Sequence, residues 1–123
     1  RLRVAARSKL SDAVITHGMP HLGRGKHGHY LIELRNVMGE AAGMRAFGAA
    51  SLELASVAAG RVDGYWDEPL APWDMAAGIL MVREAGGFVS DKNGQQDMYE
   101  QKNIVAGNEV IQGQLLRTLK KPV

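Results

Sequence analysis

Residues Trp73–Gly87 read WDMAAGILMVREAGG, an apolar run that ends in two glycines. Pro72 suits the first turn of a helix and Asp74 suits its amino-terminal end, so the pattern predicts a helix that begins near Pro72–Asp74 and runs to Ala85. Its apolar side chains go nearly all the way round, which is typical of a largely buried helix. The glycine pair then ends the helix.

Strand and helix patterns alternate on both sides of this run. Apolar residues spaced three and four apart predict a helix at Tyr30–Ala42 and a second at Ala49–Ala59. A final helix is predicted at Asn108–Leu119, with Asn108 as its cap. The remaining predicted elements are short strands at Leu2–Ala5, Ala13–Thr16, Val62–Trp66, Phe88–Ser90 and Asn103–Ala106, and turns at Ser8–Asp12 and Asp91–Gln96. This alternation predicts a layered α/β sandwich with a mixed, mostly parallel sheet.

Composition narrows the class of protein. The 123 residues suit one domain with a single core, and 46% hydrophobic with 23% charged residues is ordinary for a globular protein. Cysteine is absent, which excludes a disulfide framework, a thiol nucleophile and a thiolate metal site in this sequence. The net charge of +2 does not demand a polyanionic partner. The longest nearly apolar run, Met75–Val82, is too short to cross a bilayer, and a cytoplasmic location is expected.

The run at Trp73–Gly87 resembles the second signature of the inositol monophosphatase family, with its Trp-Asp pair, small residues, apolar run and closing Gly-Gly. The resemblance continues through Gly48–Ser51, Val57–Trp66 and Asn103–Asn108, and looks most like the bacterial SuhB-like branch. It implies that residues 1–123 are the carboxyl-terminal half-domain of a magnesium-dependent, lithium-sensitive phosphatase, with the amino-terminal half absent. A start at Arg1, without an initiator methionine, agrees with that expectation.

Asp74 is the candidate metal ligand. A carboxylate in the first turn of a helix lies beside orphan backbone donors, and hard cations such as Mg²⁺ prefer such oxygen ligands. Spacing alone favours a helix cap, because capping is the commoner role of such an aspartate. The resemblance implies that Asp74 binds Mg²⁺ together with a glutamate and an Asp-Pro-x-Asp-Gly-Thr motif that this sequence lacks.

Gly48, Ala49 and Ala50 open the second predicted helix. Their backbone N–H groups and small side chains would let a ligand approach closely, although small residues also suit a close packing turn. The resemblance implies that this turn contacts the hydroxyls of the substrate and lies near its phosphate. Ala49 stands where many family members carry Thr or Ser.

Asp67 and Arg45 are the other candidate substrate residues. The resemblance implies that Asp67 accepts hydrogen bonds from inositol hydroxyls, at a position where well-studied members carry a longer Glu. The adjacent Glu68 could serve instead, or Asp67–Pro69 could be a solvated turn. For Arg45, the resemblance implies support of the substrate site or of a subunit interface, whereas an ordinary solvated arginine is the alternative.

A glycine- and histidine-rich segment, His17–His29, is expected to be a basic surface loop. Four histidines lie in it, at His17, His21, His27 and His29. They sit among glycines, without a helical pair or a cysteine partner, so a zinc site is not favoured.

Taken with the resemblance, these residues imply hydrolysis of myo-inositol monophosphate or a similar polyol phosphate by the full-length protein. This chain alone is expected to be inactive, because most of the implied metal ligands lie outside it. A homodimer is also implied. The alternative function is a SuhB-like binding module that acts with the transcription machinery in ribosomal RNA synthesis.

Overall fold

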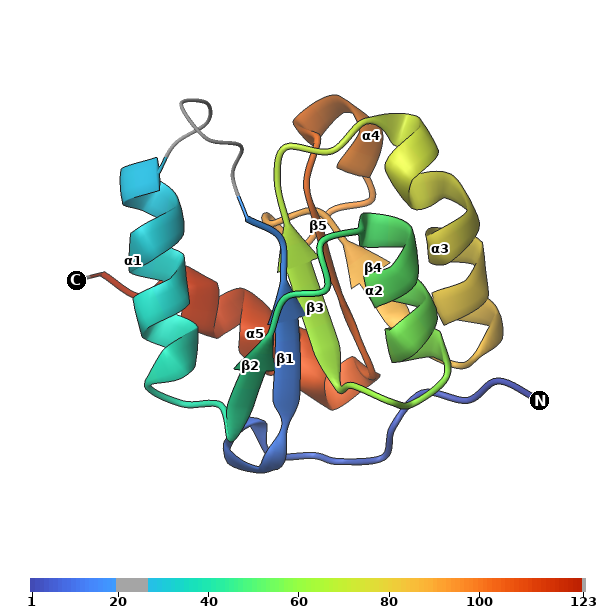
Figure 1. Ribbon diagram of the computed structural model, residues 1–123, viewed down its shortest axis with the longest axis horizontal. Coiled ribbons are helices and arrows are strands. Elements are labelled where there is room, and N and C mark those ends of the chain that lie inside the picture. The colour runs from blue at the N-terminus through green and yellow to red at the C-terminus, as the bar shows by residue number, and fades with distance from the viewer. Residues whose placement is uncertain (20–26, 123) are drawn as a thin grey trace.

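The computed structural model describes residues 1–19 and 27–122. In that part of the chain a five-stranded sheet, ordered β2-β1-β3-β5-β4, has helices on both faces (Figure 1). Its strands are β1 (Val14–His17), β2 (Gly43–Arg45), β3 (Gly64–Asp67), β4 (Phe88–Ser90) and β5 (Ile104–Gly107). The helices are α1 (His27–Met38), α2 (Ala50–Ala58), α3 (Pro72–Glu84), α4 (Met98–Gln101) and α5 (Glu109–Leu119), with a short 3₁₀ turn, η1, at Leu10–Asp12.

The sheet is mixed, as the alternation of elements predicts. Strand β1 pairs in parallel with β2 and with β3, whereas β5 pairs antiparallel with β3 and with β4. Strands β1 to β4 therefore run in one direction and β5 runs against them. The predicted layered α/β sandwich with a mixed, mostly parallel sheet is confirmed.

Two hydrophobic cores lie on the two faces of the sheet, because successive residues of a strand point to opposite faces. Tyr65 packs in the core that includes Leu54 of α2 and Ile79 of α3. Its neighbour Trp66 packs in the other core, with residues of α1 and α5. Figure 1 shows α2 beside α3, and α1 beside α5, in agreement with their contacts.

The approach of α2 to α3 depends on Gly78. A Cβ atom added at Gly78 would lie 2.4 Å from Leu54 Cδ1, closer than real Cβ contacts allow. The two helices therefore pack closely at their middle parts, and residues at their amino-terminal ends line the candidate site.

Helix α3 follows the predicted span, but the expectation that it is largely buried is wrong. Its buried residues are Met75, Gly78, Ile79 and Val82, on one face only. Trp73 is 83% exposed and Leu80 is 60% exposed. An apolar helix sequence does not by itself say which residues a neighbouring element covers.

Other differences concern short elements. The predicted strand at Leu2–Ala5 does not join the sheet; Val4 packs against the α2–α3 core, and its N–H donates to the Ala85 carbonyl at 3.1 Å. Strand β2 and helix α4 were not predicted, since three and four residues carry too little periodicity. Helix α1 begins at His27 and ends at Met38, earlier at both ends than predicted.

The cap of α5 forms as predicted, with Asn108 Oδ1 accepting from the Ile111 N–H at 2.8 Å. Among the helices that the structure describes, none combines the length and the apolar character needed to span a bilayer.

Candidate active site

A cavity of about 530 Å³ lies where β1 and β3 end and where α2 and α3 begin. Segments 17–19, 46–51 and 67–70 line it, together with Glu53 and Asp74. Five of the predicted site residues therefore share one cavity: Gly48, Ala49, Ala50, Asp67 and Asp74. The fold brings them together from three segments of the sequence.

Asp74 lies in the first turn of α3 and partly caps it. Its Oδ2 accepts from the Ala71 N–H at 2.9 Å, while its own N–H donates to the Ala71 carbonyl at 3.0 Å. The N-cap residue itself is Ala71, which has no side-chain cap. The structure thus gives Asp74 a capping bond and a place on the cavity wall, so the two interpretations of this residue are compatible.

The turn before α2 is shaped by Gly48, whose φ of +85° lies in the left-handed region that favours glycine. Ala49 is the N-cap of α2 and offers no side-chain acceptor, and Ala50 is the first helical residue. Because the first N–H groups of a helix have no partner within it, an uncapped helix end at a cavity suits an anionic ligand.

Asp67 is held at the end of β3 by Tyr65, whose hydroxyl donates to Asp67 Oδ2 at 2.6 Å. Burial raises the pKa of Asp67 to about 6; hydrogen bonds from Tyr65 and the Glu68 backbone oppose this rise, and the charge of Asp74 adds to it. Burial, and secondarily the charge of Asp67, also raises the pKa of Tyr65. Carboxylates crowd this end of the cavity, which would favour a bound cation.

The adjacent Glu68 lines the same cavity but is engaged elsewhere, in an ion pair with Lys92. Asp67 is partnered by the Tyr65 hydroxyl instead.

Glu53 is a site residue that the sequence analysis did not single out. It is 1% exposed, and its Oε1 accepts from the Phe47 N–H at 3.1 Å. Its Oε2 is buried and has no hydrogen-bond partner among residues 1–19 and 27–122. An acidic residue next to Leu54 on the buried face of α2, where helical spacing predicts an apolar side chain, is the signal that could have found it.

Arg45 is not brought to the cavity. It is exposed at the end of β2, and its guanidinium donates to the Met44 carbonyl at 2.8 Å. It is not among the residues that line the cavity. A direct contact with substrate is therefore not supported by this structure, and a role at a subunit interface stays a prediction.

The four histidines form no common site within the described residues. His17 ends β1, where it lies 5.3 Å from the Trp66 ring and its Nδ1 is 2.9 Å from the Tyr30 hydroxyl. Burial lowers its pKa. His27 and His29 belong to the first turn of α1, and His21 falls outside the described residues. The first residue of the expected loop at His17–His29 thus ends a strand and its last three begin a helix, while residues 20–26 lie outside the described residues.

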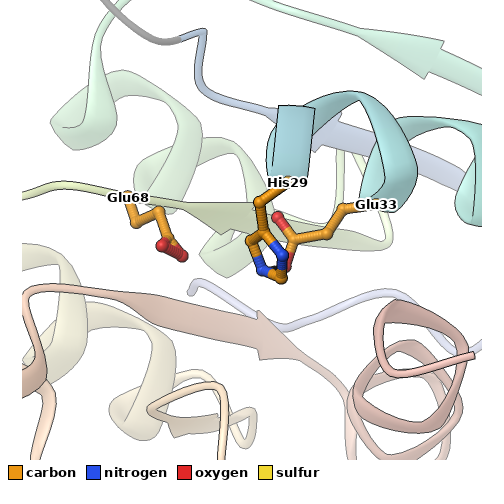
Figure 2. Close-up of side chains that lie close together, drawn as sticks. All are labelled: His29, Glu33 and Glu68. Atoms are coloured by element: carbon orange, nitrogen blue, oxygen red, sulfur yellow. Dashed lines mark ion pairs between the residues drawn. The ribbon is translucent and has the colours of Figure 1, made fainter. Parts of the chain in front are cut away.

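His29 belongs instead to a cluster with Glu33 of the same helix and Glu68 after β3 (Figure 2). The ligand atoms of these three residues lie within 4.8 Å of one another. Lys92, however, forms ion pairs with both Glu33 and Glu68, and its Nζ lies 3.2 Å from His29 Nε2. A lysine ammonium already supplies the cation of this cluster.

The chain belongs to the inositol monophosphatase family, whose model matches residues 1–122. An inositol-1-monophosphatase of Mesorhizobium japonicum is 63% identical over 123 residues, which are 100% of this chain and 46% of the relative. The Nus factor SuhB of Pseudomonas aeruginosa is 46% identical over 98% of this chain and 45% of its own length. The crystal structure of the extragenic suppressor protein suhB from Bartonella henselae superposes with a TM-score of 0.96 at 63% identity, covering 100% of this chain and 48% of that one. The chain thus spans about half the length of these relatives.

Proposed function

We propose that the full-length protein hydrolyses myo-inositol monophosphate or a similar polyol phosphate with Mg²⁺, and that residues 1–123 are the carboxyl-terminal half-domain, which supplies part of its active site. One observation carries the proposal: the uncapped start of α2 and the carboxylates of Asp67 and Asp74 line one cavity. The name of the Mesorhizobium relative supports the substrate class.

The residues that are present fit Mg²⁺. This cation prefers oxygen ligands, and it commonly takes one or two carboxylates from the protein and shares the rest with phosphate and water. Asp74 would hold it, because one oxygen serves the helix cap while the residue lines the cavity. Burial raises the pKa of Asp67 and the charge of Asp74 adds to that rise, so a cation bound here would relieve the repulsion between these acidic groups.

Each part of the cavity has a distinct task in this proposal. The N–H groups at Gly48–Ala50 hold the anionic end of the substrate. Asp67, oriented by Tyr65, accepts hydrogen bonds from the polyol hydroxyls. When bound, the metal supplies an activated water and neutralises charge on the leaving oxygen.

The test is a phosphatase assay of the full-length protein against myo-inositol 1-phosphate and other phosphomonoesters, with titrations of Mg²⁺ and Li⁺. We expect Mg²⁺-dependent turnover that Li⁺ inhibits, and none from the isolated 123-residue chain. Absence of turnover by the full-length protein at every Mg²⁺ concentration would reject the proposal. Turnover by the purified chain would reject the claim that it is inactive alone.

A binding role is the second candidate, favoured by the 46% identity to a Nus factor SuhB. Capture of RNA polymerase by the full-length protein, compared with capture by a variant that lacks phosphatase activity, separates the two functions. A homodimer and a cytoplasmic location are part of the same proposal, and sedimentation of the full-length protein tests the dimer.

A further inference from the structure

Glu53 occupies an unusual position in the cavity. It lies in the first turn of α2, yet its side chain is buried and reaches back to the turn that precedes the helix. Through Oε1 it accepts from the Phe47 N–H at 3.1 Å. That bond ties the residue before Gly48 to the helix, so Glu53 fixes the turn whose residues line the cavity.

The other oxygen of Glu53 has no partner that would favour a negative charge. Oε2 is buried and makes no hydrogen bond within the described residues. Burying an ionised carboxylate without a paired charge is strongly unfavourable, so such a group takes its neutral form.

The groups around Glu53 are also mostly acidic or neutral. Asp67 and Tyr65 approach from β3, Asp74 lies at the start of α3, and His17 at the end of β1, where burial lowers its pKa and so favours the uncharged ring. These neighbours therefore add negative charge, and none of the described residues that line the cavity is a lysine or an arginine.

Resting on the proposed function, we propose that Glu53 is a positioning residue that works as a neutral acid: it holds the Gly48 turn through Oε1 without adding a second negative charge beside Asp67. Burial raises the pKa of Glu53 to about 7, and the charge of Asp67 adds to the rise against the Phe47 hydrogen bond. Above about pH 7 Glu53 is ionised, and its negative charge lies next to the Gly48 turn, where the anion binds in this proposal. Anion binding then weakens while the chemistry of the bound substrate is less affected.

The experiment compares the full-length protein with Glu53→Gln, which keeps an oxygen for the Phe47 N–H and stays neutral at every pH. Sulfate is the first probe, because its charge is constant between about pH 6 and about pH 8.5. We expect wild-type affinity for sulfate to fall up to about tenfold per pH unit above the titration of Glu53, and the Glu53→Gln affinity to stay level. For myo-inositol 1-phosphate, the KM ratio of the two proteins should change in the same way, with kcat nearly equal.

Two controls sharpen the result. Glu84→Gln removes one carboxylate at an exposed position and should leave the pH profile unchanged. Glu53→Ala loses the bond to Phe47, so it should bind sulfate weakly at every pH. The proposal would be overturned if Glu53→Ala and Glu53→Gln had equal affinity for sulfate. It would also be overturned if the sulfate affinities of wild type and Glu53→Gln changed in parallel with pH.

A further measurement needs no variant. The ¹³C resonance of the Glu53 carboxyl in the wild-type protein should titrate near neutrality, and a midpoint in the ordinary range of glutamate would overturn the proposal. If the full-length protein proves to have no phosphatase activity, the proposed function fails, while sulfate binding and the ¹³C titration still decide the state of Glu53.

Discussion

Gly18 and Asp67 occupy complementary space: a Cβ atom added to Gly18 would lie 1.8 Å from Asp67 Oδ1 and 2.0 Å from its carboxyl carbon. Gly18 directly follows β1, and Asp67 ends β3, the parallel neighbour of β1; the Gly18 N–H donates to the Trp66 carbonyl at 3.2 Å. Because Gly18 has no side chain, the Asp67 carboxylate can lie where a Cβ atom would otherwise be. The Tyr65 hydroxyl donates to Oδ2 and holds the carboxylate in this place.

We expect Gly18→Ala in the full-length protein to displace the Asp67 carboxylate from the Tyr65 hydroxyl. Loss of one charge-assisted hydrogen bond to substrate should raise KM about tenfold, corresponding to roughly 1.4 kcal/mol, with a smaller change in kcat. Steady-state kinetics measures the effect. Gly28→Ala is the control, because a Cβ at this exposed position in α1 meets nothing within 4 Å. An unchanged KM for Gly18→Ala would mean that Asp67 does not contact the substrate.

Asp74→Asn separates the metal role from the cap. Asparagine can still accept from the Ala71 N–H, so we expect the melting temperature without metal to change little. Loss of the negative charge should lower Mg²⁺-dependent turnover by on the order of a thousandfold. Activity against Mg²⁺ concentration and thermal unfolding are the two measurements. Near-normal turnover at ordinary Mg²⁺, with a change confined to the melting temperature, would show that Asp74 is a cap alone.

Lys92→Met should be strongly destabilising because it removes the ammonium that Glu33 and Glu68 share. The Glu33 side chain is 2% exposed and that of Lys92 is 13% exposed, so the variant leaves a buried carboxylate without its cation. We expect a loss of about 3 kcal/mol in the free energy of unfolding by urea.

Lys121→Met is the matched control for this ion pair, since Lys121 is exposed and its partner Glu40 is partly exposed, and their contribution should be below about 1 kcal/mol. Adding Glu33→Gln to Lys92→Met should recover part of the lost stability. Equal losses for the two lysine variants would show that the buried pair contributes no more than a surface pair.

Stability should also fall as the pH rises. For Asp67 and Glu53 the folded-state pKa lies above the ordinary value, so the folded state binds these protons more tightly than the unfolded state. Their contribution is complete below the unfolded pKa, near 4, and is lost as the pH rises through about 6 and about 7. Without added metal, we expect the melting temperature to decrease from about pH 5 to about pH 8, and Asp67→Asn to flatten this decrease. A melting temperature that rises over this pH interval would contradict the raised pKa values of Asp67 and Glu53.

Helix ends were predicted correctly where the sequence carries a local capping signal. Pro72 and Asp74 mark the start of α3, and Asn108 caps α5, because capping depends only on residues within a turn. Strand β2 could not be predicted, since its three residues form a strand only through pairing with β1. The exposure of Trp73 escaped prediction for a related reason: burial is set by neighbouring elements.

The residues of the candidate site likewise include some that the sequence could predict and some that it could not. The family resemblance singled out Gly48, Asp67 and Asp74, which the fold brings to one cavity. Gly18 and Glu53 were missed because their importance lies in what they touch: the carboxyl of a residue 49 positions away for Gly18, and the backbone of the preceding turn for Glu53. Arg45 matched a family position, yet its side chain lies against its own strand.

The alternation in β3 has a consequence for engineering the pocket. Tyr65, Trp66 and Asp67 are consecutive, and each has a different destination: one core, the opposite core, and the cavity. Inserting or deleting a single residue in this strand would send each side chain to the wrong face, whereas a change of two would preserve the parity. We therefore expect that loop segments 46–49 and 68–70 can be exchanged with those of relatives without turning these side chains to the wrong face, provided that the number of residues in β3 is unchanged.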